Sequence, residues 1–325
     1  MMKNKILNIV LFFRTINIFL LKQLSRLLVP GCLFAFISAG SLFAVNGAGT
    51  SIGTFLNLPA GARASGMGEA FTAISDDATA VYWNPAGMNF ISNPSVSLMH
   101  SIWFEGMTYD WVSGVFPTSL GTFGAGVQYM NYGSIPETNV DGLELGSYNP
   151  ADLSFSLSYG TEISGLKIGL TAKYISLRVK NYTTAFAGDF GLITTLNLAG
   201  LKTNIGAAIH NFGMQAIFVN EKESLPTTGN IGAAVWIIPE WTVSVETIIP
   251  FDNVIGFAAG TEFSVKVADN VNLIGRAGYY SRSNLNNITF GAGVKIDNIS
   301  VDYAFEPFGD LGDTHRFSFN MQFGK

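Results

Sequence analysis

Residues 152–160 read DLSFSLSYG, and every second side chain in this stretch is large and apolar. Leu153, Phe155, Leu157 and Tyr159 share one face of an extended chain, because successive side chains of a β-strand point to opposite faces. Aspartate and three serines take the other face. The same alternation recurs at residues 299–306 and 314–323, so the pattern predicts strands with one apolar and one polar face.

The period-two pattern extends outward from this stretch over most of the chain after residue 94. It marks fourteen segments, at residues 95–105, 108–116, 121–132, 151–161, 166–178, 183–197, 203–211, 228–237, 241–249, 254–266, 271–280, 287–296, 299–306 and 314–323. A strand that crosses a bilayer at a tilt needs about 9–11 residues, whereas a soluble strand typically has about 5–6. After residue 45, no run of 18 residues is both apolar and uncharged. The lengths therefore favour a transmembrane β-barrel over a soluble β-sandwich.

The connections between these segments differ on the two sides of the predicted barrel. Every second gap is short, at residues 117–120, 162–165, 198–202, 238–240, 267–270 and 297–298. The other set includes the long gaps at residues 133–150, 212–227, 281–286 and 307–313. Short turns on the periplasmic side and longer loops outside are typical of bacterial outer-membrane barrels.

The predicted strands must close into a ring, because lipid cannot satisfy the backbone groups of a free strand edge. Fourteen strands enclose more space than side chains alone can fill, so a lumen or a plug is expected. Isolated charges on the polar faces are candidates to line this interior. They are Lys173, Glu246, Glu262, Arg276 and Lys295.

Composition excludes several other classes of protein. Of 325 residues, 48% are apolar and only 13% charged, about half the ~25% that is usual in globular proteins. Neither a disordered tail nor a coiled coil has such a composition. The formal net charge of −5 also argues against a nucleic-acid partner, since a phosphate-binding surface needs clustered Lys and Arg.

The first 44 residues contain five cations and no acid, and they end in an apolar run over residues 27–44. This arrangement is typical of an export signal. We expect a signal peptide at residues 1–47 and the bacterial outer membrane as the location of the processed chain. The only cysteine, Cys32, lies within this signal, so neither a disulfide nor a cysteine-based metal site is expected after processing.

Residues 48–93 lack the alternation and are rich in small side chains. Asp76 or Asp77 is placed to cap a short helix that runs through Tyr82, and residues 84–87, NPAG, predict a turn. Small residues can pack inside a barrel, so we expect a short N-terminal plug, or hatch, with one or two small helices. A periplasmic extension is the alternative. The barrel itself would take residues 94–325.

Several residues of this segment are candidates to shape the hatch. They are Arg63, Gly66, Gly68, Glu69, Asp76, Asn84, Pro85 and Gly87. Arg63 or Glu69 could pair with a lumen charge such as Glu246 or Arg276.

Two groups of motifs carry a resemblance to a known family. Residues 66–71 (GMGEAF), 76–80 (DDATA) and 83–88 (WNPAGM) resemble the N-terminal signature of the PorV/PorQ family, which belongs with the FadL-like long-chain fatty-acid transporters. Residues 302–305 (DYAF) and 312–318 (GDTHRFS) resemble its closing strands. The resemblance implies a 14-stranded barrel with a hatch in its lumen. It implies passage of hydrophobic molecules or an accessory role in type IX protein secretion.

The sequence indicates no catalytic chemistry. His100, His210 and His315 are the only histidines, and none belongs to a metal-binding or catalytic motif. We therefore expect no enzyme, no cofactor and no metal. The expected partners are outer-membrane lipid and either a hydrophobic small molecule or exported proteins and secretion components. A structural or adhesive barrel with a closed plug is the second interpretation, and an exported soluble sandwich is the third.

Overall fold

The computed structural model describes residues 50–214, 216–218, 221–281, 287–308 and 312–324. The expected signal peptide at residues 1–47 lies outside the described residues. The helical elements are short: η1 (Thr54–Asn57), α3 (Ala62–Gly66), α4 (Ala80–Trp83), η2 (Pro85–Phe90) and η3 (Phe104–Gly106). No helix in the described part of the chain has the length and apolarity needed to cross a membrane.

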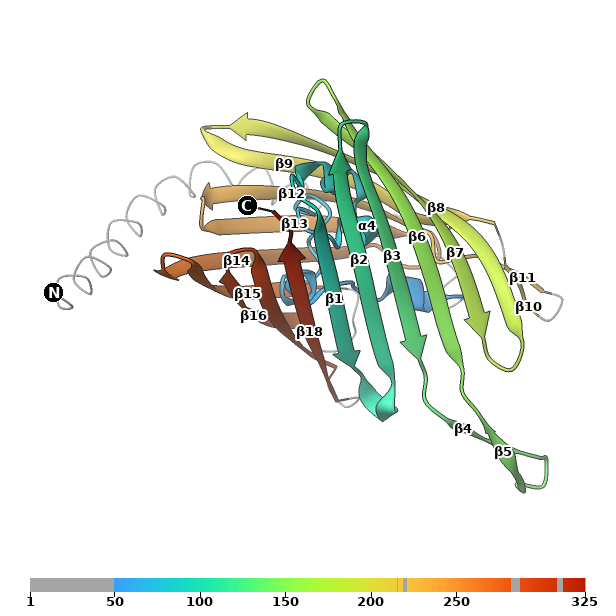
Figure 1. Ribbon diagram of the computed structural model, residues 1–325. Coiled ribbons are helices and arrows are strands. Elements are labelled where there is room, and N and C mark those ends of the chain that lie inside the picture. The colour runs from blue at the N-terminus through green and yellow to red at the C-terminus, as the bar shows by residue number, and fades with distance from the viewer. Residues whose placement is uncertain (1–49, 215, 219–220, 282–286, 309–311, 325) are drawn as a thin grey trace. The chain divides into compact units, whose positions relative to one another are not determined.

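Fourteen strands form a closed antiparallel barrel (Figure 1). They are β1 (Ser95–Ile102), β2 (Thr108–Thr118), β3 (Gly121–Asn131), β6 (Ala151–Ile163), β7 (Leu166–Arg178), β8 (Tyr182–Leu198), β9 (Leu201–Gly213), β12 (Thr228–Ile238), β13 (Trp241–Pro250), β14 (Gly256–Ala268), β15 (Val271–Tyr280), β16 (Ile288–Ile296), β17 (Ile299–Pro307) and β18 (Asp313–Gln322). β1 pairs with β2 on one side and with β18 on the other, which closes the ring. The predicted fourteen-stranded barrel is confirmed.

Six two-residue turns lie at one end of the barrel, which we call the short-turn end. They occupy residues 119–120, 164–165, 199–200, 239–240, 269–270 and 297–298. Both residues of Ser164-Gly165 and of Ala199-Gly200 have positive φ, the conformation of the type I′ turns that join twisted antiparallel strands. The expected asymmetry of the connections is therefore observed.

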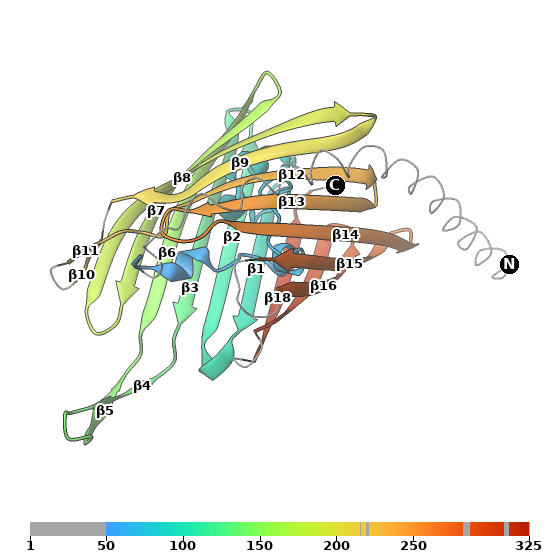
Figure 2. The same cartoon turned by 180° about the vertical axis from the view of Figure 1, so that it is seen from behind.

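The opposite, long-loop end differs from the prediction in two respects. The loops after β3 and β9 contain hairpins of their own, formed by β4 (Ile135–Thr138) with β5 (Glu144–Tyr148) and by β10 (Ala216–Phe218) with β11 (Glu221–Glu223). The β4–β5 hairpin projects from the end of the barrel in both views (Figure 1, Figure 2). By contrast, only residues 179–181 join β7 to β8, so not every connection at this end is long.

The two faces of the strands separate as their alternation predicts. In β6, Leu153, Phe155 and Leu157 are exposed on the outside of the ring, while Ser154 and Ser156 are buried inside it. Nearly every barrel strand carries such outward-facing apolar side chains. The outside of the barrel is therefore an apolar surface.

Residues 50–94, the N-terminal segment, lie within the ring of strands (Figure 2). α3 contacts β15 to β18, and η2 contacts β3, β6, β7 and β8, so the segment touches strands from both halves of the chain. Helix α4 begins later than predicted. The Oδ1 atom of Asp77 accepts a hydrogen bond from Thr79 N (2.9 Å) in the turn before the helix. Residues 84–87 do not form a simple turn, because Pro85 opens the 3-10 helix η2.

Candidate functional site

Glycines bring the N-terminal segment into backbone contact with the barrel wall. A Cβ placed on Gly66 of α3 would lie 2.9 Å from the Cα of Gly291 in β16. Gly68 has a φ of 61°, and a Cβ placed on Gly278 of β15 would lie 2.0 Å from its nitrogen. Real Cβ atoms essentially never approach another heavy atom within 3.0 Å. The wall at Gly278 therefore has no room for a side chain while the segment is in place.

Asn84 forms hydrogen bonds both within the N-terminal segment and to the barrel wall. Its side-chain oxygen accepts a hydrogen bond from Ala86 N (3.1 Å) and so caps η2. Its side-chain nitrogen donates to the carbonyl oxygens of Thr72 (3.0 Å) and of Leu192 in β8 (3.2 Å). The residue is fully buried, so these bonds replace the water that its amide group would otherwise need.

Pro85 and Gly87 fill the space beside Asn84. A Cβ on Gly169 of β7 would lie 2.2 Å from the carbonyl carbon of Pro85, and one on Gly87 would lie 2.1 Å from the oxygen of Ser75. Both glycines are thus required by close backbone packing, which explains the small residues of the NPAG sequence.

Arg63 lies at the centre of an ion network between the segment and the barrel. Its Nε and one terminal nitrogen donate to the two carboxylate oxygens of Glu262 in β14, at 2.8 and 2.9 Å. Its other terminal nitrogen donates to Asp76 (2.6 Å) and Asp77 (3.0 Å). Burial acts to lower the pKa of Arg63, but Asp76, Glu262 and Asp77 outweigh it and raise the pKa well above its usual value. The carboxylate that Arg63 contacts is thus Glu262, not Glu246.

The same network continues along the wall. Arg276 donates from Nε to Glu262 (2.7 Å) and forms an ion pair with Asp302 of β17 (2.8 Å). Lys295 lies on the inward side of β16 close to the short-turn end, where it is exposed and lines a cavity of about 300 Å³ together with this network. Three of the five expected lumen charges therefore lie around one cavity.

Glu246 lies elsewhere in the interior, in β13. One of its oxygens accepts from Thr72 N (2.9 Å), and the other accepts from Thr72 Oγ1 (2.7 Å) and from Asn230 Nδ2 (2.8 Å). Glu69, with a φ of 66°, lines the same cavity of about 40 Å³ as Glu246. The two glutamates are therefore on the long-loop side of the segment, apart from the Arg63 network.

Lys173 belongs to a buried cluster of the opposite wall. Its ammonium group pairs with Asp189 of β8 and donates to the side-chain oxygen of Asn211, both at 2.8 Å. Asp189 sits at a bulge of the β8–β9 pairing and also accepts from Asn211 N (2.8 Å). His210 lies 3.7 Å from the same carboxylate.

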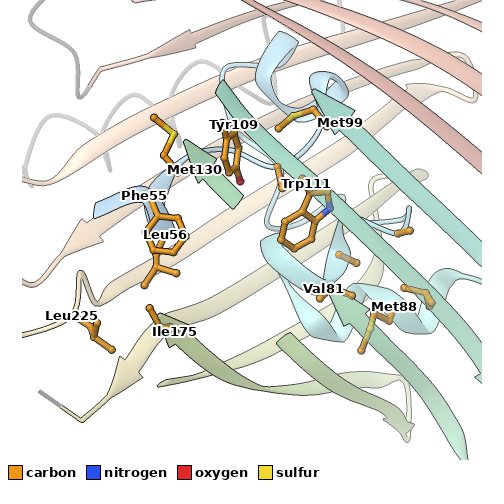
Figure 3. Packing of buried hydrophobic residues seen from close by; sticks show 14 of the residues in the cluster. Phe55, Leu56, Val81, Met88, Met99, Tyr109, Trp111, Met130, Ile175 and Leu225 are labelled. Atoms are coloured by element: carbon orange, nitrogen blue, oxygen red, sulfur yellow. The ribbon is translucent and has the colours of Figure 1, made fainter. Parts of the chain in front are cut away.

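Part of the interior is apolar, in contrast to the polar lining that the sequence predicts (Figure 3). Tyr109 and Trp111 of β2 point inward and are at most 1% exposed, and they belong to one cluster with Phe55 and Leu56 of the N-terminal segment. The cluster further includes Met99, Met130, Ile175, Leu177 and Leu225. The polar strand faces expected to line the interior are thus interrupted by inward-facing apolar side chains of β1, β2, β3 and β7.

Two cavities lie on opposite sides of the N-terminal segment. The larger one is at the short-turn end, where residues such as Asn272, Asn298 and Gln322 line it. The smaller one lies toward the long-loop end, beside His210 and Tyr280. They share no lining residue, so the segment separates them.

Several residues of this interior were not predicted from the sequence. Thr72, Asp189 and Asn230 carry buried hydrogen bonds or ion pairs, yet no motif in the sequence sets them apart. Asp189 was detectable as an isolated acid on the polar face of its strand, by the same signal that marked Lys173.

Together, the closed ring and its filled interior define a β-barrel with an internal N-terminal segment. The chain belongs to an uncharacterised protein family, UPF0164, whose model matches residues 48–228. No curated protein matches the sequence.

Solved structures give the same fold. The Pseudomonas putida toluene transporter TodX superposes with a TM-score of 0.54 at 14% identity, over 82% of this chain and 99% of TodX. The Ralstonia pickettii toluene transporter TbuX gives a TM-score of 0.54 at 12% identity, over 82% of this chain and 98% of TbuX. At such low identity the likeness establishes the fold alone, and it agrees with the closed barrel expected from the sequence.

Proposed function

We propose that this protein resides in the bacterial outer membrane and passes small hydrophobic molecules across it. In this proposal residues 1–47 are the export signal, residues 48–93 are the plug, and residues 94–325 are the barrel that spans the bilayer. No chemical conversion of the solute is involved, so the protein is not an enzyme.

The outward-facing side chains support the location. Leu157, Leu170 and Phe290 are 53–56% exposed, and large apolar surfaces left open to water are uncommon in soluble proteins. A band of such residues around a closed barrel is the surface that lipid tails cover.

The apolar sector of the interior is the observation that carries the choice of solute. A porin that conducts water-soluble molecules has a polar lumen, whereas Tyr109, Trp111 and Met130 make one wall of this interior apolar. The likeness of the fold to toluene transporters agrees with a hydrophobic solute. Phe55 and Leu56 now cover that wall, so passage requires the N-terminal segment to move.

Uptake of toluene into proteoliposomes tests the proposal. We expect the purified barrel to speed entry of toluene and to leave the entry of a small sugar unchanged. Heat-modifiable migration in detergent checks that the barrel is folded. Equal rates in empty and protein-containing vesicles, with the barrel shown to be folded, would refute the transport function.

The β4–β5 hairpin favours a second candidate function. It carries Val140, Leu143 and Leu145, which are 61–102% exposed, and such apolar groups beyond the membrane suit contact with another protein. An accessory role in type IX secretion, as the PorV/PorQ resemblance implies, or an adhesive role would use this hairpin. Shortening it should then retain exported proteins in the periplasm, or reduce adhesion, without changing toluene uptake.

A further inference from the structure

We propose that residues 50–57, which we call the clasp, close the barrel at its long-loop end, and that a solute enters when the clasp detaches from the loops there. The inference deepens the proposed passage of hydrophobic molecules and rests on it, because it names the part of the N-terminal segment that must move. The place of the clasp at the cell-surface end can be tested without any transport.

The clasp is tied to two loops of the long-loop end. Figure 2 shows the start of the N-terminal segment, drawn in blue, beside β10 and β11. Ser51 forms a parallel β-bridge with Ser224, and Ile52 N donates a hydrogen bond to Ser224 O (3.0 Å). Ser51 Oγ donates to the carboxylate of Asp252. Ser224 lies in the loop before β12 and Asp252 in the loop after β13, so the clasp joins two separate connections across the mouth of the barrel.

Apolar side chains of the clasp pack beneath these bonds. Phe55 and Leu56 are at most 2% exposed and belong to one cluster with Leu177 and Leu225. Leu177 is the last residue but one of β7, and Leu225 precedes β12, so this part of the cluster lies at the long-loop end. A Cβ placed on Gly53 would lie 3.6–3.8 Å from methyl carbons of both leucines, which is ordinary contact. The clasp is therefore packed closely against this side of the mouth.

The N-terminal segment crosses the barrel from end to end. It joins the wall at the short-turn end, where Phe323 N donates to Pro94 O (2.7 Å) just before β1. The ion network of Arg63 and the backbone contact of Gly68 lie between this point and the clasp. The clasp can therefore detach while these contacts keep the rest of the segment in place.

Detachment of the clasp would open the interior at the long-loop end. Leu56 and Asn57 line the cavity of about 40 Å³ on that side of the segment, and Leu56 packs in one cluster with the inward-facing Tyr109 and Trp111. The cavity and this apolar wall would both be uncovered. Once residues 1–47 are removed, the clasp would be held covalently at one end only, so its movement requires no change in the barrel wall.

Maleimide labelling of intact cells tests where the clasp lies. Cys32 is the only cysteine and belongs to the expected export signal, so a cysteine introduced after residue 47 is the one thiol of the processed chain. Thr50 is exposed, and we expect Thr50→Cys to react with a membrane-impermeant maleimide as strongly as Val140→Cys in the β4–β5 hairpin. Glu240→Cys, in the exposed short turn between β12 and β13, should take up at least tenfold less label until the cells are permeabilised.

A disulfide tests whether the clasp controls entry. Neighbouring strands lie about 4.7–4.9 Å apart and a disulfide joins Cα atoms about 4.4–6.8 Å apart, so cysteines at the bridge partners Ser51 and Ser224 are within reach of each other. We expect the oxidised double variant to pass toluene into proteoliposomes at least tenfold more slowly than the same protein after reduction. The single variants Ser51→Cys and Ser224→Cys, which cannot form the bond, should pass toluene equally in both conditions.

Three results would overturn the inference. They are labelling of Thr50→Cys only after permeabilisation, failure of the disulfide to form in the folded double variant, and equal toluene entry through the oxidised and reduced double variant when mass spectrometry confirms the bond. If the unchanged protein passes no toluene, the proposed function fails and solute entry fails with it. The labelling and the formation of the disulfide still decide whether the clasp closes the long-loop end.

Discussion

Replacing Gly278 with alanine should displace the N-terminal segment from the barrel wall. The new Cβ would lie 2.0 Å from the nitrogen of Gly68 and 2.2 Å from the carbonyl carbon of Met67. Ordinary contact begins at 3.4 Å, so the segment must retreat by about 1.4 Å (3.4 − 2.0). Both contacts are with backbone atoms, which cannot turn aside as the end of a side chain can.

The displacement should be seen first in hydrogen exchange. Overpacking a buried site costs about 1–3 kcal/mol, and this corresponds to a factor of about 5–150 in an equilibrium constant. The N–H of Gly68 donates to Thr289 Oγ1 (3.1 Å) and to Ser65 O (3.1 Å). We expect its protection against exchange to fall by that factor, because the opened state becomes more populated.

The barrel offers a matched control on the same strand. A Cβ on Gly275 of β15 meets nothing within 4 Å, so Gly275→Ala should leave protection unchanged. Gly66→Ala should fall between the two, since its Cβ would need only about 0.5 Å more room (3.4 − 2.9) against Gly291. Equal protection of the Gly68 amide in the Gly278 and Gly275 variants, with both barrels folded, would refute the close backbone contact.

Three further changes test other contacts of the N-terminal segment. Arg63→Gln should raise the leakage of a small dye into vesicles, because it removes the part-buried ion pairs with Asp76 and Asp77 and leaves Glu262 with Arg276 alone; Lys180→Gln, at an exposed ion pair, should not. Asn84→Ala should lower the exchange protection of Ala86 by about fivefold, since a lost cap costs about 1 kcal/mol; unchanged protection would contradict the cap. Leu56→Ala should destabilise the packed segment by about 2–5 kcal/mol and expose Trp111 to a water-soluble fluorescence quencher, whereas unchanged quenching would place Leu56 outside that contact.

The barrel could be predicted from the sequence because lipid and lumen impose opposite demands on alternate residues. In β6 the apolar set Leu153, Phe155 and Leu157 and the serines between them fix both the strand and its inward face. Turn signals such as Ser164-Gly165 then mark one end of the barrel. Each of these features lies within about ten residues of sequence, so no distant contact is needed to recognise it.

The apolar wall could not be predicted in the same way. In β2, Tyr109 and Trp111 face inward, whereas Val112 and Phe116 face outward. Because both faces of this strand are apolar, the alternation of side chains does not indicate which face points into the barrel. The side chain that covers this wall, Leu56, is more than fifty residues away in the sequence. Whether Leu56 packs on this wall depends on how the N-terminal segment and the barrel fold together, which a local pattern does not contain.

The partner of Arg63 in the ion network could not be predicted from local sequence patterns either. The sequence marks Arg63 and Glu262 as isolated charges in a region poor in charge, but 199 positions separate them. Two lumen acids, Glu246 and Glu262, were candidates, and the small residues around Gly66 determine how deeply the segment packs and thus which acid Arg63 reaches.

The order in which the chain is made has a consequence for its assembly. The N–H of Ala62, near the start, donates to the hydroxyl of Ser318 in the last strand, at 2.7 Å across 256 positions. That bond cannot form until Ser318 has been synthesised, and contacts of such large separation are slow to form because the intervening loop must first be closed. Packing of the N-terminal segment should therefore finish late, and an interrupted chain lacking β18 would lose both the bond from Ala62 to Ser318 and the pairing of β18 with β1 that closes the ring.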